Sequence, residues 1–198
     1  GNTVIDALIK SVEKVNENPS HLIQDLSKQI GNQEVVLVTG HRRENHGVGF
    51  ERICKALKRI AHHDKERLII YPVHLNPKVQ EPVSRILAEV SNVILIDTLA
   101  YQDFIWLMNR SKIIITDSGG VQEEAPSLGK PVLVMRDNTE RPVTTYKGTN
   151  HLVGADIDNT LKKFNEILNG KVKKGNIPEK WDGNASKRVS NIISKFLK

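Results

Sequence analysis

The 198-residue sequence contains a single cysteine, Cys54, and no long apolar run. One cysteine excludes an intrachain disulfide and a cysteine-based metal cluster, and it favours a reducing, cytoplasmic compartment. A run of ~20 apolar residues would be needed to cross a bilayer, and no signal-peptide pattern opens the chain, so we expect no membrane partner. An initiator Met is also missing at Gly1, and we therefore expect a piece of a longer protein.

The net charge of +6 is the compositional feature that suggests a nucleic-acid partner. The distribution of this charge argues against such a partner. Residues 162–198 carry ten Lys or Arg against three Asp or Glu, so this segment alone has a larger positive charge than the whole chain. Aromatic residues that could stack on bases are few and scattered there: Phe164, Trp181 and Phe196. We therefore interpret the surplus as a solvated basic surface and expect no nucleic-acid binding.

From residue 34 onward, short apolar runs alternate with amphipathic segments. The runs are continuous in Val, Ile and Leu, which is typical of strands covered on both faces. The predicted strands are Glu34–Thr39, Arg67–Val73, Val93–Asp97, Lys112–Thr116, Pro131–Met135 and a short one near His151–Val153. Helical patterns follow them at residues 50–61, 79–90, 102–110, 120–127 and 158–169. Repeated strand–helix–strand units predict an α/β fold, a Rossmann-like open parallel sheet with helices on both faces.

Polar and glycine-rich residues gather where the predicted strands end. In an open parallel sheet, ligands bind beyond the carboxyl ends of the strands. The clearest of these segments is TDSGG at Thr116–Gly120. We expect it to offer the N–H groups of Ser118, Gly119 and Gly120, together with a hydroxyl, to an anion at a helix N-terminus.

Two glutamates follow this turn, and we expect both Glu123 and Glu124 in the first helical turn. A carboxylate there would repel a phosphate at contact distance, so the pattern favours an acceptor for sugar hydroxyls. A diphosphate beside a ribose describes a nucleotide. The alternative is a tight turn between a strand and a helix, with both glutamates capping the helix.

His41 opens the polar cluster GHRRENHG directly after the first predicted strand. Its imidazole could donate to a phosphate oxygen or transfer a proton near neutral pH, and the alternative is a solvated loop. His74 follows the second strand and could contact a ligand or satisfy backbone groups. The histidines lack the spacing of known zinc sites, so we predict no metal centre.

Arg141 precedes Pro142 after the fifth predicted strand, and the proline favours an extended backbone at residue 141. Its guanidinium could bind a phosphate through two parallel hydrogen bonds. The alternative is an internal salt bridge with Glu140 or Asp137. Cys54 lies on the apolar face of a predicted helix, and we interpret it as an inert core residue.

Three motifs together resemble the non-hydrolysing UDP-N-acetylglucosamine 2-epimerases. They are VTGHRRENHGVGFERICKAL, YPVHLNPKVQEPV and ITDSGGVQEEAPSLGKPVLVMRDNTERP, in this order. The opening GNTVIDAL is similar to the segment where that family enters its second domain. The resemblance implies that residues 1–198 are the UDP-binding C-terminal domain of a two-domain glycosyltransferase-B-type protein, whose N-terminal domain is absent.

The resemblance also implies a role for each matching residue. The backbone near Leu99 and Phe104 would hold the uracil, and Ser118, Gly119 and Gly120 would bind the diphosphate. Glu124 would accept the ribose hydroxyls, and Arg141 would complete the phosphate side. His41 would be a catalytic residue or would stabilise the leaving group. Arg42 and His74 resemble residues that contact a second, activating UDP-sugar. The chain departs from the family at Val143, where an acidic residue is usual, and this concerns the polar contacts beyond Arg141.

The implied reaction inverts C2 of UDP-N-acetylglucosamine by eliminating and re-adding UDP, without a cofactor. In the family the carboxylates that act on the sugar come from the N-terminal half, so this half would stabilise the leaving diphosphate. The implied partners are a UDP-sugar and, for the whole enzyme, a second copy in a homodimer. The alternatives are a UDP-sugar glycosyltransferase domain, against which GHRREN and NTERP weigh, and a module that only binds a nucleotide.

Amphipathic patterns at Thr3–Val15 and Ala185–Lys198 flank the sheet region, and residues 171–183 form a predicted loop. In the resembling architecture the last helix often crosses to the other domain, so we expect residues 184–198 to pack toward it. For the chain alone we therefore expect weak UDP binding, negligible turnover and a tendency to self-associate.

Overall fold

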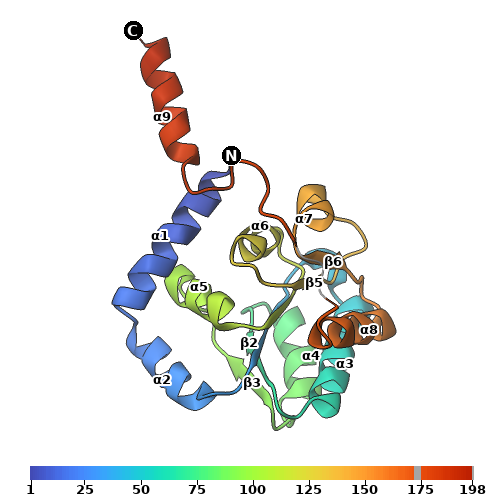
Figure 1. Cartoon of the computed structure of the whole chain (residues 1–198). Coiled ribbons are helices and arrows are strands. Elements are labelled where there is room, and N and C mark those ends of the chain that lie inside the picture. The colour runs from blue at the N-terminus through green and yellow to red at the C-terminus, as the bar shows by residue number, and fades with distance from the viewer. Residues whose placement is uncertain (172–174, 198) are drawn as a thin grey trace.

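The computed structural model describes residues 1–171 and 175–197 and contains one six-stranded sheet (Figure 1). The strands are β1 (Val35–Thr39), β2 (Leu68–Pro72), β3 (Val93–Ile96), β4 (Ile113–Thr116), β5 (Val132–Val134) and β6 (Asn150–Leu152). Every neighbouring pair is parallel, in the order β3-β2-β1-β4-β5-β6. The predicted α/β parallel sheet is confirmed. Its order reverses between β1 and β4, which is where open sheets of this kind bind ligands.

The continuous apolar sequence of the strands results from burial on both faces. In β1, Val36 and Val38 point into one hydrophobic cluster, whereas Val35 and Leu37 point into the other. All four side chains are fully buried. Successive residues of a strand point to opposite faces, so a strand between two helical layers needs apolar residues at every position.

Helices cover both faces of the sheet (Figure 1). One layer contains α1 (Thr3–Glu17), α2 (His21–Ile30), α5 (Tyr101–Arg110) and α6 (Gly119–Ser127). The opposite layer contains α3 (Val48–His63), α4 (Pro77–Leu87) and α8 (Ile157–Leu168). The start of α4 is fixed by its cap, because Asn76 Oδ1 accepts the Lys78 N–H at 3.0 Å and Pro77 is the first helical residue.

Three short elements were not predicted: the 3-10 helix η1 (Arg43–Asn45), α2 and α7 (Pro142–Tyr146). The signal for α2 was present in the sequence. Ser20 caps the helix by accepting the Ile23 N–H at 3.2 Å, and Ile23, Leu26 and Ile30 form a buried stripe. Of the predicted loop at 171–183, residues 172–174 lie outside the described part, as does Lys198 of the predicted terminal helix.

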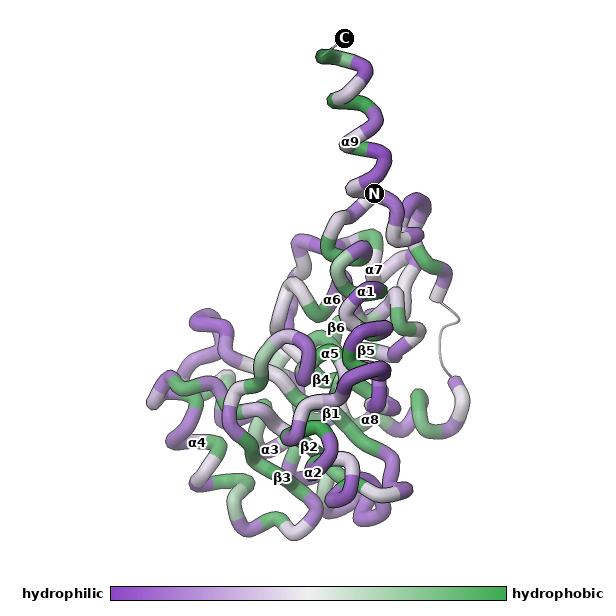
Figure 2. Tube along the Cα trace, turned by 90° about the vertical axis from the view of Figure 1, so that its left-hand side faces the viewer, coloured by the Kyte–Doolittle hydropathy of each residue, from purple (hydrophilic) through white to green (hydrophobic). Residues whose placement is uncertain are grey.

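The terminal helix α9 (Ala185–Phe196) projects away from the sheet (Figures 1 and 2). Its N-terminus is attached to α1, where Asp6 accepts the N–H groups of Ala185 at 3.1 Å and Ser186 at 2.6 Å. The Ser186 hydroxyl also donates to Asp6, at 2.6 Å, and this bond is the largest cause of the lowered pKa of Asp6, followed by the bond from the Ser186 N–H. Beyond this attachment the apolar stripe is open to water, with Ile192 68% and Phe196 90% exposed. None of the helices in the described residues is long and apolar enough to cross a membrane.

We predict that Ile192→Asp abolishes self-association of the isolated chain. Ile192 lies in the middle of the exposed stripe of α9, where a charge would have to be desolvated in any apolar contact between copies. Sedimentation velocity should show a concentration-dependent coefficient for the wild type and a monomer for the variant. Ser190→Asp adds the same charge at an exposed position off the stripe and should behave like the wild type. A wild-type chain that stays monomeric at all concentrations contradicts this prediction.

Candidate functional site

The loops after β1 and β4 meet at one buried carboxylate, that of Asp117. It accepts the backbone N–H of His41 at 3.1 Å and of Arg42 at 2.9 Å, and Asn45 Nδ2 at 3.0 Å. Asp117 is fully buried. Asn45 also donates to Met135 O at 3.3 Å, at the end of β5. The GHRREN and TDSGG motifs therefore form one structure at the switch point of the sheet.

An ion-pair cluster connects the loop after β5 to the loop after β1. The side chain of Arg136 is 8% exposed and lies 2.7 Å from Glu44 and 2.7 Å from Glu140. Its guanidinium lowers the pKa of Glu140 to about 2. Glu44 belongs to the His41 loop and Glu140 to the Arg141 loop, so Arg136 holds the two loops together.

The turn before α6 has the features of an anion site. The helix begins at Gly119, so the N–H groups of Gly119, Gly120 and Val121 have no partner within the helix. The guanidinium of Arg42 lies against this turn, with Nη2 only 3.1 Å from the place that a β-carbon on Gly119 would occupy. A positive side chain beside a helix N-terminus favours an anion such as phosphate.

Ser118 differs from the prediction in one respect. Its backbone N–H donates to Thr116 Oγ1 at 2.9 Å and is therefore not available to an anion. The Ser118 side chain makes no capping hydrogen bond to α6. The turn thus offers the Ser118 hydroxyl together with the N–H groups of Gly119 and Gly120, but not the Ser118 N–H.

Glu123 and Glu124 lie in the second turn of α6, and the prediction that they occupy the first turn was wrong. The first turn is closed by the Gln122 N–H, which donates to Ser118 O at 3.3 Å. Neither glutamate caps the helix, so the capping part of the alternative interpretation is also wrong. Glu123 pairs with Arg141 and accepts Asn2 Nδ2 at 3.0 Å.

Glu124 is buried and faces the start of α5, where its Oε1 accepts the Tyr101 hydroxyl at 3.0 Å. Burial raises the pKa of Glu124, and the hydrogen bond from Tyr101 acts in the opposite direction. The carboxylate is thus oriented by one donor and can accept from a further hydroxyl group.

Arg141 forms an ion pair within the protein, but with neither of the two carboxylates considered from the sequence, although its Nη1 donates to the Glu140 backbone carbonyl at 3.2 Å. Its Nε donates to Glu123 Oε1, whereas Glu140 is bound by Arg136. The Arg141 side chain remains 41% exposed, so it can reach a ligand above the turn. Val143 lies in the first turn of α7 and its side chain is on the surface.

His41 and His74 lie together at the ends of β1 and β2, with ring centroids 5.3 Å apart. The pKa of His41 is lowered, first by burial and then by the positive charges that His74 and Arg42 can carry, while Asp117 opposes this shift. His74 Nδ1 accepts the Asn76 N–H at 3.1 Å, which agrees with the interpretation that His74 satisfies a backbone group. The resemblance assigns Arg42 and His74 to a second UDP-sugar. Arg42 nevertheless lies beside Gly119, and His74 lies beside His41, both of which are assigned to the substrate UDP-sugar.

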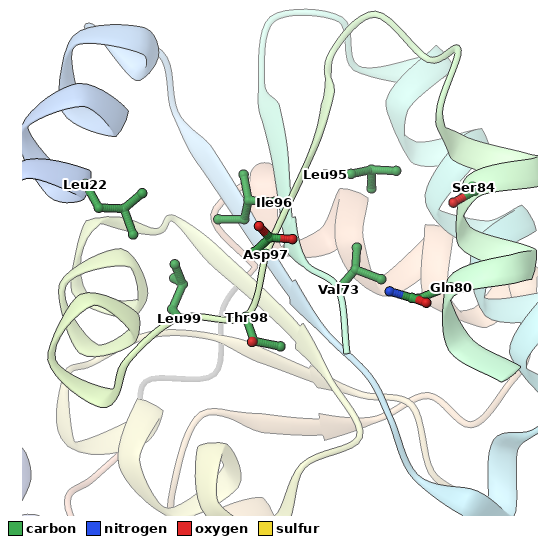
Figure 3. Close-up of a pocket in the computed structure, with 9 residues that line it drawn as sticks. All are labelled: Leu22, Val73, Gln80, Ser84, Leu95, Ile96, Asp97, Thr98 and Leu99. Carbon is green, nitrogen blue, oxygen red and sulfur yellow. The ribbon is translucent and has the colours of Figure 1, made fainter. Parts of the chain in front are cut away.

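Leu99 lies just before α5, and Phe104 lies in the first turn of that helix. A cavity of about 700 Å3 beside the edge strand β3 is lined by Leu99 but by none of the other candidate residues (Figure 3). The Phe104 N–H donates to Ala100 O at 2.9 Å inside α5, so it is not free for a base. The Phe104 ring is partly buried against the core. A base bound near the start of α5 would therefore have to contact the Leu99 backbone and the Phe104 ring.

The described residues contain no group of three or more His, Cys, Asp or Glu side chains that could hold a metal ion. Cys54 is fully buried in the core, and burial raises the pKa of its thiol to about 12. This agrees with its interpretation as an inert residue.

Comparison with known proteins gives matches over the whole described fold. The sequence pattern of the UDP-N-acetylglucosamine 2-epimerase family matches residues 1–194. The UDP-N-acetylglucosamine 2-epimerase of Campylobacter jejuni is 47% identical over 206 residues, covering 98% of this chain and 54% of that protein. The chain spans about half the length of the curated relatives it matches.

Solved structures agree with this result. The crystal structure of UDP-GlcNAc 2-epimerase from Neisseria meningitidis bound to UDP-GlcNAc superimposes with a TM-score of 0.88 at 41% identity, over 98% of this chain and 54% of that one. A trehalose 6-phosphate synthase from Burkholderia multivorans gives a TM-score of 0.63 at 10% identity, over 96% of this chain and 44% of that one. The second likeness concerns the fold alone, and together they confirm the expected Rossmann-like, glycosyltransferase-B-type domain.

Proposed function

The chain belongs to the UDP-N-acetylglucosamine 2-epimerase family, and from this membership we propose that it is the UDP-binding half of an enzyme that interconverts UDP-N-acetylglucosamine and its C2 epimer. The observation that carries the proposal is the position of Arg42 against the Gly119 turn, held there by the hydrogen bonds that the His41 loop donates to Asp117. This arrangement supplies a cation and free N–H groups for a diphosphate.

Each remaining part of the nucleotide has a proposed contact. The diphosphate binds at Gly119 and Gly120, with the hydroxyl of Ser118 and the side chain of Arg141 beside it. The ribose hydroxyls donate to Glu124, whose carboxylate is oriented by Tyr101. The uracil lies by the Leu99 backbone and the Phe104 ring.

The proposed chemistry follows from what these groups can stabilise. Elimination removes the C2 proton and breaks the C1–O bond, so that UDP leaves with the electron pair and negative charge develops on the diphosphate. Arg42 and the helix N-terminus lower the free energy of that charge, and His41 donates to a phosphate oxygen. Re-addition of UDP and reprotonation of C2 on the other face complete the inversion. We propose that the acid and base acting on C2 belong to the other half of the complete protein.

The remaining proposals concern the whole protein. We propose that residues 1–198 form its C-terminal domain and that α9 packs its exposed stripe on the preceding domain, because this stripe is open to water here. We further propose that the complete enzyme is a homodimer and, from the single cysteine, that it works in the reducing cytoplasm.

Isothermal titration calorimetry of the chain with UDP, UMP and uridine tests the proposal. We expect UDP to bind more tightly than UMP, and uridine to bind most weakly, because the cationic turn contacts both phosphates. An absence of heat and of any thermal shift at millimolar UDP would refute a nucleotide site. In the complete protein, UDP-N-acetylglucosamine should epimerise without an acceptor, and a requirement for an acceptor would instead identify a glycosyltransferase.

We predict that UDP binding weakens as the pH falls toward 5, and does so at a higher pH in Tyr101→Phe. Ionised Glu124 accepts the ribose hydroxyls, and its pKa is already raised by burial, so it gains a proton earlier than an exposed glutamate as the pH falls. Loss of the Tyr101 hydroxyl removes the bond that opposes this shift. Calorimetry between pH 8 and pH 5 measures the effect. Glu124→Gln should bind UDP weakly at every pH, and a wild-type pH profile in Tyr101→Phe would contradict the prediction.

A further inference from the structure

Two histidines from neighbouring strand ends form a ring stack at the edge of the site. The planes of His41 and His74 are inclined by only 13°, with centroids 5.3 Å apart. His41 is half-buried and His74 is exposed. The outer ring therefore shields one face of the inner ring from water.

The outer ring is itself held in place. His74 Nδ1 accepts the Asn76 N–H, and a ring nitrogen that accepts a hydrogen bond carries no proton. The proton of the neutral His74 ring is thus on Nε2. Asn76 is fixed in turn as the N-cap of α4, through its bond from the Lys78 N–H. The start of α4 thereby determines both the position and the tautomer of His74.

The charges around His41 come from three elements. Asp117, at the end of β4, accepts the His41 backbone N–H and would favour a protonated ring. The Arg42 guanidinium, in the same loop, acts in the opposite direction. His74, at the end of β2, does so as well when its ring is protonated and no longer accepts the Asn76 N–H. Burial disfavours the charged ring further and is the largest cause of the lowered pKa of His41.

We propose that His74 is a positioning residue for His41: its ring stacks on the His41 imidazole, holds it in place and covers one of its faces. This rests on the proposed role of His41 at the diphosphate. A neutral imidazole can donate a hydrogen bond from one nitrogen and accept a proton at the other, whereas a protonated one can only donate. His74 would thus keep His41 able to work in both directions of a reversible elimination.

NMR titration of the histidine ring protons, on the full 198-residue chain without nucleotide, tests the proposal. His74→Ala removes both the stack and the second imidazole, and the His41 midpoint should rise toward the usual 6.5. His74→Phe keeps an aromatic ring over His41 but has no titrating nitrogen, so its midpoint should lie between those of the wild type and His74→Ala. His62→Ala, at an exposed position near the end of α3, is the matched control and should leave the His41 midpoint unchanged.

An unchanged His41 midpoint in His74→Ala would overturn the proposal, as would an equal rise in His62→Ala. A His74→Phe midpoint equal to that of the wild type would overturn the electrostatic part and retain the stacking part. Thermal unfolding of each variant shows whether a shift comes from a folded chain. Because the titration contains no nucleotide, failure of UDP to bind would refute the proposed function without affecting this result.

Discussion

Replacement of Asp117 by Asn is expected to lower the free energy of unfolding by ~3 kcal/mol and to weaken UDP binding at least tenfold. The carboxylate accepts from two backbone N–H groups and from Asn45, and it is fully buried. An asparagine places its own NH2 group where at least one of these donors points. A buried donor then loses its acceptor, and the folded state is destabilised by the free energy of keeping that donor away from water without a hydrogen bond.

The effect on binding has a separate cause. Without the hydrogen bonds to Asp117, the backbone at His41 and Arg42 is no longer fixed, and the Arg42 guanidinium loses its place against Gly119. Urea unfolding and UDP calorimetry measure the two effects. Asp25→Asn changes a carboxylate on α2 whose side chain is 76% exposed, and it should alter neither quantity appreciably. An Asp117→Asn chain as stable as the wild type would contradict the assigned role.

The sheet was predictable from the sequence because its two-sided burial leaves a strong local signal. The first four residues of β1, VVLV, are apolar without a break, as a strand between two helical layers requires. Helix α2 was missed although its apolar stripe and serine cap are present, since it precedes the repeated strand–helix pattern that guided the prediction. Helix α7 has five residues and no apolar stripe, so local sequence offers little by which to predict it.

The site was predictable as a set of residue types, but not as a network. Strand ends placed His41 and Gly119 on one edge, and the structure brings the two loops together at Asp117. That Asp117 makes this connection could not be read from TDSGG, because its partners are 72 to 76 residues away. For the same reason Arg141 was matched to its sequence neighbours, whereas its partner Glu123 lies on another element.

Arg42→Ala is expected to weaken UDP binding by about 10- to 100-fold, the effect of losing one or two charge-assisted hydrogen bonds to a diphosphate. The Arg42 side chain lies at the N-terminus of α6, so its charge adds to that of the helix end. Uridine has no phosphate, and its affinity should not change. Higher salt should reduce the difference between wild type and variant, since a partly exposed charge pair is screened.

The neighbouring arginine provides the control for Arg42. Arg43→Ala removes the same charge one residue along the loop, but its side chain is exposed. If a general positive field attracts the nucleotide, both variants should lose affinity equally. If Arg42 contacts the diphosphate directly, only Arg42→Ala should lose it, and the loss should be larger for UDP than for UMP. Equal losses would contradict a direct contact, and an unchanged affinity in Arg42→Ala would place the anion elsewhere on the sheet edge.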